Sequence, residues 1–268
     1  MSERLPVLAN PRSDRMRTVA SLGRRSFRLR KGLLRVEGPQ AVRELLRFRP
    51  DHVTDVYATE TAQARSADVW QQAREVTRWR HEVSDEVAEA VAPDAQGIFA
   101  VAHLAAVGGD PYQAELDRPL VVLPSTQDPG NAGVIIRSAD AFGAGGVITC
   151  VGTVDLTSPK VIRSSAGSIF HLPLAQGQDF AEALARLRAD GRQILGTSGA
   201  DGAIEAGTLD LSRPHAWLMG NEAQGLSAGE AAACDQLVRI DMTGAAESLN
   251  VGVASGICLY LSQLARST

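Results

Sequence analysis

The sequence predicts an α/β protein with two domains, the second of which is built on a mostly parallel sheet. From residue 120 onward, short apolar runs alternate with helical patterns, which is typical of a parallel sheet with helices on both faces. A polar stretch at residues 107–119, containing two glycines and two prolines, separates this part from a smaller α/β part, so we predict a linker there. Of the 268 residues, 44% are hydrophobic and 22% charged, a composition that excludes a disordered chain.

The N-terminal domain, residues 1–106, is predicted from its alternating helices and strands. Gly38-Pro39 favours a helix start, because proline suits the first helical turn. The elements expected here are a helix from Pro39 through Leu46, a strand over Val53–Ala58, helices over Ala67–Val76 and Ser84–Val91, and a strand over Ile98–Leu104.

The C-terminal domain, residues 120–268, contains five apolar runs that we predict as strands. They are Leu120–Leu123, Gly146–Val151, Gln193–Leu195, Ala216–Met219 and Leu237–Ile240. Asp179 and Gly191 bound one helical pattern, and Ser227 and Glu230 have the spacing of a capping box. A long helix is predicted from Leu249 to Leu264. Its apolar residues spread around much of its circumference, so we expect it to form part of a twofold interface in a homodimer.

The net charge of −4 hides a strong asymmetry. Residues 1–50 hold 13 Lys/Arg and four Asp/Glu, and nine of the cations lie between Arg12 and Arg35 with only Asp14 opposing them. Such a block predicts a polyanionic partner, namely RNA, because phosphate neutralisation releases counterions. A solvated charged face is the alternative. The residues expected to be exposed and to bind RNA are Arg25, Arg28, Arg30 and Lys31.

The cysteines and the hydropathy pattern bear on the cellular compartment. Cys150, Cys234 and Cys258 are odd in number and lie in apolar runs, so we expect neither a disulfide framework nor a metal site. No apolar stretch approaches the length of a membrane span. The N-terminal arginines are not followed by an apolar segment, so the sequence predicts no signal peptide. We therefore expect a cytoplasmic protein without a membrane partner.

Three segments after predicted strands are candidates for ligand binding, because parallel sheets bind ligands beyond the carboxyl ends of their strands. The first is Gln127–Arg137, a turn that leads into a helix. Asn131 suits the N-cap of that helix. Arg137 is unusual, because a cation in a helix expected to be largely buried needs a partner or a substrate.

The other two segments are rich in small residues. In Thr157–Pro173, Pro159 suits the first turn of one helix that is dense in small residues, namely Ser164, Ser165, Gly167 and Ser168. Small residues permit close backbone approach to a ligand, and packing within the protein is the alternative explanation. The third segment has two parts, residues 218–226 and residues 239–254, which follow two strands. Their bare, bent backbone can wrap a flat heteroaromatic ligand and hydrogen-bond it through N–H and C=O groups.

Together, in this order, the segments resemble the three motifs of the SpoU (TrmH-like) branch of the SPOUT methyltransferases. The motifs are Asn-x-Gly-x-x-x-Arg at 131–137, Met-Gly-Asn-Glu-x-x-Gly-Leu at 219–226 and Ser-Leu-Asn-Val at 248–251. Asp241 departs from the pattern, since the family commonly has proline there. The N-terminal part is similar to the RNA substrate-binding domain, itself resembling ribosomal protein L30e, that several rRNA-modifying members carry.

The resemblance implies a fold, a reaction and a set of site residues. It implies a deep trefoil knot, a homodimer with active sites at the interface, S-adenosylmethionine as methyl donor and ribose 2′-O-methylation of RNA as the reaction. The residues at the family's cofactor positions are Gly220, Ile240 and Leu249 through their backbone, with Thr197, Asn221 and Ser248 nearby. The residues at its polar catalytic positions are Asn131, Arg137, Glu222 and Asn250.

An ordinary guanidinium stays protonated, so Arg137 cannot itself be a base. We expect it to orient the ribose hydroxyl and a neighbouring phosphate and to stabilise alkoxide charge, with a phosphate oxygen as proton acceptor and Glu222 and Asn250 as orienting groups. Asn131 could instead be only a turn and cap residue. Three alternatives are a dinucleotide enzyme, for which Gly143-Ala-Gly-Gly146 is misplaced, a non-catalytic RNA-binding protein, and a tRNA methyltransferase. Large-subunit rRNA is the favoured substrate, with either a housekeeping or an antibiotic-resistance role.

Overall fold

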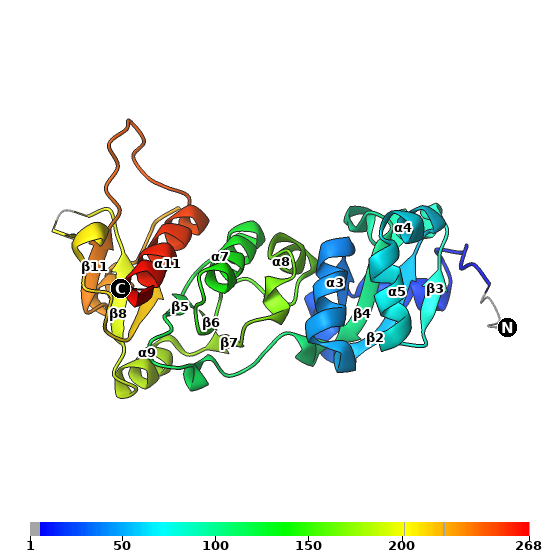
Figure 1. Ribbon diagram of the computed structural model, residues 1–268, viewed down its shortest axis with the longest axis horizontal. Helices are drawn as coiled ribbons and strands as arrows, with labels where there is room; N and C mark the ends of the chain where they lie inside the picture. Colours follow the sequence, from blue (N-terminus) through cyan, green and yellow to red (C-terminus); the bar gives the residue numbers. More distant parts are fainter. Residues whose placement is uncertain (1–5, 201, 222, 268) are drawn as a thin grey trace. The chain divides into compact units, whose positions relative to one another are not determined.

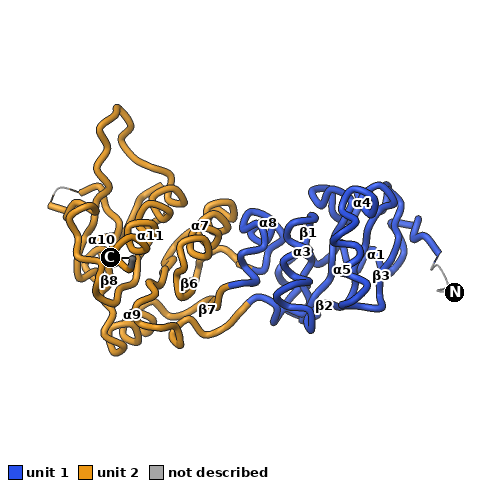
Figure 2. The backbone as a smooth tube through the Cα atoms, viewed as in Figure 1, with its two compact units in different colours: residues 1–107, 157–171 blue, residues 108–156, 172–268 orange. Residues whose placement is uncertain are grey.

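The computed structural model describes residues 6–200, 202–221 and 223–267. The chain forms two compact units, shown in Figure 2. Unit 1 comprises residues 1–107 and 157–171, and unit 2 comprises residues 108–156 and 172–268. Thr157–His171 therefore packs with the N-terminal unit, although it lies between two strands of the C-terminal unit in the sequence.

Unit 1 is a four-stranded sheet between two helical layers. The strand order is β1-β4-β2-β3, in which β4 is antiparallel to β1 and to β2, and β2 is parallel to β3. The strands are β1 (Leu33–Glu37), β2 (Val53–Ala58), β3 (Arg80–Glu82) and β4 (Ile98–His103). The helices are α1 (Asp14–Ser21), α2 (Arg25–Lys31), α3 (Pro39–Phe48), α4 (Glu60–Arg65), α5 (Ala67–Val76) and α6 (Asp85–Val91).

The first fifty residues carry three elements that the sequence analysis did not anticipate: α1, α2 and β1. Ser13 caps α1 by accepting from the backbone N–H of Met16, and Met16, Val19 and Leu22 pack on the sheet with α6. These apolar residues are spaced three apart among arginines, so the charge density concealed the stripe. In β1, Arg35 and Glu37 are buried and form an ion pair of 2.6 Å.

The segment Thr157–His171 is not the single helix that we predicted. It forms α8 (Pro159–Ser164), then a turn, then a 3-10 turn over Ser168–Phe170. Ala166 and Gly167 have φ values of 51° and 95°, which end the helix. A Cβ on Gly167 would lie 2.5 Å from Cγ of Glu44 in α3, so close approach requires glycine here, as the small residues suggested.

Unit 2 is built on a sheet in which the seven described strands are all parallel, in the order β7-β6-β5-β10-β8-β11-β9. A mostly parallel sheet was predicted and is confirmed. The strands are β5 (Leu120–Leu123), β6 (Gly146–Cys150), β7 (Leu174–Gln178), β8 (Gln193–Thr197), β9 (Ile204–Glu205), β10 (His215–Leu218) and β11 (Gln236–Arg239). The helices are α7 (Pro129–Ala141), α9 (Phe180–Ala189), α10 (Ala228–Ala232) and α11 (Val251–Ser267).

Helices cover both faces of this sheet (Figure 1). The apolar face of α9 packs on alternate residues of β5, β8 and β10, such as Leu120, Ile194 and Ala216. On the other face, α11 lies over β10, where Trp217 donates from Nε1 to Oγ of Ser262 at 2.9 Å. Helices α7 and α11 approach closely, since a Cβ on Gly252 would lie 2.8 Å from a Val134 methyl group.

The stretch predicted as a linker, 107–119, is folded against unit 2. It contains a 3-10 turn over Pro111–Gln113. The buried guanidinium of Arg192 donates to four backbone carbonyls of this stretch, those of Ala114, Glu115, Leu116 and Arg118, at 2.7–3.3 Å. Because these bonds fix it, the stretch is not a flexible spacer. No helix within the described residues is long and apolar enough to cross a bilayer.

Candidate active site

The loops that follow β5 and β10 meet at the carboxyl edge of the parallel sheet. After β10, the backbones of Asn221 and Gly225 exchange two hydrogen bonds of 2.8 and 2.9 Å, which close a tight turn. The Asn221 side chain donates from Nδ2 to the carbonyl of Ser125, just after β5, at 3.1 Å. Asn221 therefore holds together two loops that are 96 residues apart in the sequence.

Gly220 immediately precedes this turn, packs against its far end and is buried. A Cβ at this position would collide with the backbone of Gly225 and Leu226, so the turn itself requires glycine. The N–H and C=O groups of Gly220 form no hydrogen bond to a described residue. Since nearly all buried backbone groups in proteins are paired, these two groups are suited to binding a ligand.

Asn131 and Asn250 meet across the N-terminal ends of α7 and α11. Nδ2 of Asn250 donates to Oδ1 of Asn131 at 2.8 Å. Oδ1 of Asn250 accepts from the backbone N–H of Gly252 at 2.8 Å and of Val253 at 3.3 Å, as an N-cap residue does. The two helix N-termini therefore lie side by side, and their dipoles favour negative charge there.

Asn131 is not the N-cap of α7, contrary to our expectation from the sequence. Asp128 is the cap, since its Oδ1 accepts from the backbone N–H of Asn131 at 2.8 Å. Aspartate is as good a cap as asparagine, and Pro129 then fills the first helical position. The Asn131 side chain is thereby left to bind Asn250.

From the sequence we expected Arg137 to lie in a largely buried helix and therefore to need a partner or a substrate, but the structure places its side chain on the outer face of that helix. It is the ninth residue of α7 and is exposed. The helix buries Ala132, Ile135, Ile136 and Ala139, while Val134 and Arg137 face outward. Within the described part of the chain, Arg137 forms no hydrogen bond or ion pair.

The remaining cofactor candidates lie on or beside the long connection from β11 to α11, which extends away from the sheet (Figure 1). Residues 241–250 are all exposed, including Ser248 and Leu249. Ile240 is half-buried at the end of β11. Asp241 pairs with Arg239 at 2.7 Å. Thr197 lies at the end of β8, the strand between β10 and β11, with its hydroxyl 3.5 Å from the Leu218 carbonyl. Glu222 lies outside the described residues.

Sequence reasoning missed Thr126, in the loop after β5. Its side chain is fully buried, and its hydroxyl has no hydrogen-bond partner in the described chain. A buried unpaired hydroxyl beside the Asn221–Ser125 contact is a candidate ligand-binding group. A lone threonine in a polar turn gives no signal of this in the sequence.

The basic block of the N-terminal region is only partly a surface. Arg25, Arg30 and Lys31 are exposed on α2, and the Arg30 guanidinium lies 4.8 Å from the centre of the Phe27 ring. Arg28 is 1% exposed, contrary to the prediction, because its Nη1 donates to the Leu22 and Gly23 carbonyls at 2.8 Å and its Nε to Thr157. Arg28 therefore holds the fold of unit 1.

Comparison with known proteins agrees with these features. The model of the SpoU rRNA Methylase family matches residues 118–260. A Bordetella pertussis protein named 23S rRNA (guanosine-2′-O-)-methyltransferase RlmB is 32% identical over 232 residues, which cover 84% of this chain and 94% of the relative. A Streptomyces viridochromogenes protein named 23S rRNA (uridine(2479)-2′-O)-methyltransferase is 34% identical over 205 residues, covering 70% and 71%.

This chain belongs to the SpoU rRNA methylase family. A crystal structure described as an RNA 2′-O ribose methyltransferase matches with a TM-score of 0.85 at 27% identity. The match covers 98% of this chain and 100% of the other chain. An AdoMet-bound rRNA methyltransferase from Sinorhizobium meliloti has a TM-score of 0.82 at 26% identity and covers 97% of both chains. The expected family, enzyme class and cofactor are thereby confirmed.

Proposed function

We propose that this SpoU-family chain methylates a ribose 2′-hydroxyl of large-subunit rRNA, with S-adenosylmethionine as donor. The observation that carries the proposal is the hydrogen bond between Asn131 and Asn250, which joins the first and third motifs at the edge of the sheet. The second motif lies at the same edge, because Asn221 binds the loop after β5 that leads into α7.

The described residues fit S-adenosylmethionine. The buried backbone of Gly220, which has no hydrogen-bond partner among the described residues, would bind the adenosyl group together with the backbone of Ile240 and Leu249. Side-chain contacts would come from Thr197, Asn221 and Ser248. The bound cofactor supplies an electrophilic methyl group on a sulfonium. The chain between Ile240 and Asn250 would wrap the cofactor, which is the course expected for the trefoil knot.

The chain's own residues position the nucleophile. Arg137 would hold the 2′-hydroxyl and an adjacent phosphate and stabilise the developing alkoxide, while a phosphate oxygen accepts the proton. Asn250 and Asn131, fixed on each other, would orient the ribose. Glu222 is assigned to orient Arg137 on the strength of its motif alone.

RNA would be held by unit 1, which we propose as the L30e-like substrate-binding domain. Its exposed cations on α2, Arg25, Arg30 and Lys31, suit phosphate contacts. Arg28 is excluded from this set by its burial. Residues 120–268 would be the catalytic domain, acting as a homodimer in the cytoplasm, where rRNA is modified.

The relatives do not agree on the base, since one is named for guanosine and another for uridine. Mapping 2′-O-methyl groups in rRNA from cells with and without the gene for this chain gives the nucleotide directly. One position that depends on the chain, and is restored by the purified protein with S-adenosylmethionine, is the expected result. An unchanged methylation map, with no transfer to unmodified rRNA in vitro, would overturn the proposal. A position at the site of action of an antibiotic would indicate resistance rather than housekeeping.

A further inference from the structure

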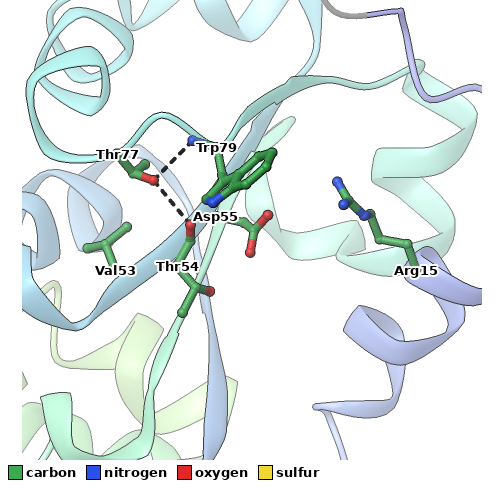
Figure 3. Close-up of a pocket in the computed structure, with 6 residues that line it drawn as sticks. All are labelled: Arg15, Val53, Thr54, Asp55, Thr77 and Trp79. Atoms are coloured by element: carbon green, nitrogen blue, oxygen red, sulfur yellow. Dashed lines mark hydrogen bonds between the residues drawn. The ribbon is translucent and has the colours of Figure 1, made fainter.

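Unit 1 contains a pocket of about 390 Å³. It is lined by Arg15, Val53, Thr54, Asp55, Thr77 and Trp79 (Figure 3). This volume is within the range of about 300–1,000 Å³ in which small ligands bind. The motifs of the family do not include any of these residues.

Trp79 is held rigidly but leaves its ring accessible. Its carbonyl accepts from the backbone N–H of Val56 at 3.0 Å, and its N–H donates to the Thr77 hydroxyl at 3.1 Å. That hydroxyl donates in turn to the Thr54 carbonyl (Figure 3). The side chain is nevertheless 46% exposed, and the Arg78 guanidinium lies 4.7 Å from the ring centre. An exposed indole with a fixed backbone and an adjacent cation is suited to stacking on a base.

The pocket also presents an acceptor and a donor side by side. Asp55 Oδ1 and Arg15 Nη1 each lie 2.9 Å from Nε2 of His81, and Figure 3 shows the carboxylate between the indole and Arg15. Burial raises the pKa of Asp55, but the hydrogen bond with His81 and the charges of His81 and Arg15 outweigh this effect. The pKa of Asp55 is therefore below its usual value, and the carboxyl is ionised at neutral pH. His81 contacts one oxygen of this carboxylate at hydrogen-bond distance, and the Thr54 and Tyr57 hydroxyls also interact with the carboxylate, which has about four acceptor sites.

We infer that this pocket binds one unpaired guanine of the substrate RNA, stacked on Trp79. Guanine presents two neighbouring N–H donors, at N1 and N2, which suit Asp55, and beside them the O6 acceptor, which suits Arg15. Adenine and cytosine each offer only one amino group to the carboxylate. The inference rests on the proposed RNA substrate and adds a base-specific contact in the N-terminal unit.

The test measures binding of fluorescent hairpin RNAs by anisotropy at fixed salt. Each hairpin has a loop of uridines with G, A, C or U at one position. We expect the wild-type chain to prefer the G hairpin, and Trp79→Ala to weaken binding of that hairpin about tenfold or more. Trp79→Phe should retain part of the affinity. Asp55→Asn should remove the preference for G over A while leaving the all-uridine hairpin unchanged.

Phe48→Ala is the matched control, because Phe48 is also exposed in unit 1, with Arg47 5.2 Å from its ring, but lies outside the pocket. Melting temperature and S-adenosylmethionine affinity, measured on every variant, separate misfolding from lost contacts. Equal affinity of folded Trp79→Ala and wild type for the G hairpin, or no base preference in the wild type, would overturn the inference. Failure of the proposed reaction would instead appear as a wild type that binds these RNAs but transfers no methyl group to rRNA.

Discussion

Arg137 is the residue to which the proposed chemistry assigns the largest effect. Because it is exposed and forms no bond within the described chain, Arg137→Ala should change the melting temperature little. S-adenosylmethionine affinity should also stay nearly constant. Methyl transfer should fall by at least about 100-fold, because the interaction lost is one that strengthens in the transition state.

Single-turnover methylation and calorimetric cofactor binding measure these quantities. Arg213→Ala is the control, since Arg213 is also an exposed arginine of unit 2 and its side chain pairs with Asp210, which belongs to none of the motifs. A near-normal single-turnover rate in folded Arg137→Ala would show that the catalytic assignment is wrong. The alternative of a buried structural cation is already removed by the exposure of the side chain.

Gly220 has a structural role that its motif does not reveal. The sequence predicts that Gly220→Val abolishes cofactor binding in an otherwise folded protein. The added side chain would meet the backbone of Gly225 and Leu226, so we now expect it also to open the turn after β10. The free energy of unfolding should fall by about 1–3 kcal/mol, with S-adenosylmethionine affinity lost. Urea titration and calorimetry test this, and unchanged cofactor affinity would contradict it.

The residues of the candidate site could be named from the sequence, but their contacts could not. The motifs identify Asn131 and Asn250. Their hydrogen bond spans 119 residues and depends on β10 lying between β5 and β8, a strand order that apolar patterning does not encode. Burial could not be predicted either: Arg28 lies in a cluster of cations and is buried, whereas Arg137 follows an apolar run and is exposed.

At the scale of elements, apolar patterning predicted strands well where apolar residues predominate. β2 and β5 have the predicted bounds, Val53–Ala58 and Leu120–Leu123. β1 and β7 were missed, because β1 carries a buried Arg35–Glu37 pair and β7 is a largely polar strand at the edge of its sheet. A strand whose burial depends on an ion pair, or which is half exposed, gives no alternation to detect.

Helix α2 combines the proposed RNA-binding surface with a structural residue. The triple variant Arg25→Ala, Arg30→Ala and Lys31→Ala should weaken rRNA binding and lower the slope of log affinity against log salt by about 3, with little loss of stability. Arg28→Ala should instead lower the free energy of unfolding by about 2–4 kcal/mol, because it leaves the buried Leu22 carbonyl and the partly buried Gly23 carbonyl without their donor. Salt-dependent binding and urea titration measure the two effects. The same salt slope in wild type and triple variant would contradict the surface assignment.

The contact of β10 with α11 predicts a pH dependence of stability. His215 donates from Nδ1 to the Arg213 carbonyl at 2.7 Å, and its Nε2 lies 2.8 Å from Ser262 Oγ. Burial lowers the pKa of His215 below its usual 6.5. The unfolded chain therefore takes up a proton that the folded chain does not, so the contribution is complete above about pH 6.5 and declines as the pH falls below it.

Urea titrations between pH 5 and 8 measure this decline. His215→Asn keeps a donor for the Arg213 carbonyl but does not titrate in this range, so its stability should be lower at pH 8 and less dependent on pH. An identical pH dependence in the wild type and His215→Asn would show that another group is responsible.

At the scale of the whole molecule, the sequence predicts two α/β parts but not how the chain is shared between them. The first compact unit ends at residue 107, the start of the predicted linker. Thr157–His171 nevertheless belongs to this unit, where Arg163 binds the buried Glu37 at 2.6 Å and Thr157 binds Arg28. Such a return of the chain depends on contacts between residues more than 120 positions apart, and local patterning is blind to them.

The last prediction concerns the homodimer. On α11, Val253, Tyr260 and Leu264 are 45–50% exposed and are spaced seven and four residues apart, which places them on one stripe of the helix. Val134, 41% exposed, extends the apolar surface onto α7, three residues before Arg137. An apolar stripe beside the proposed catalytic arginine favours an interface at which each Arg137 lies close to the partner subunit.

Leu264→Glu should therefore convert a dimer into a monomer at micromolar concentration, because it places a charge in a surface that is buried on association. Leu116→Glu is the control, since Leu116 is 49% exposed in unit 2 but lies outside α7 and α11. Sedimentation velocity without RNA measures the state of each variant, and methylation assays should show activity lost with the dimer. A monomeric wild type, or a fully active monomeric Leu264→Glu variant, would exclude an active site that needs both subunits.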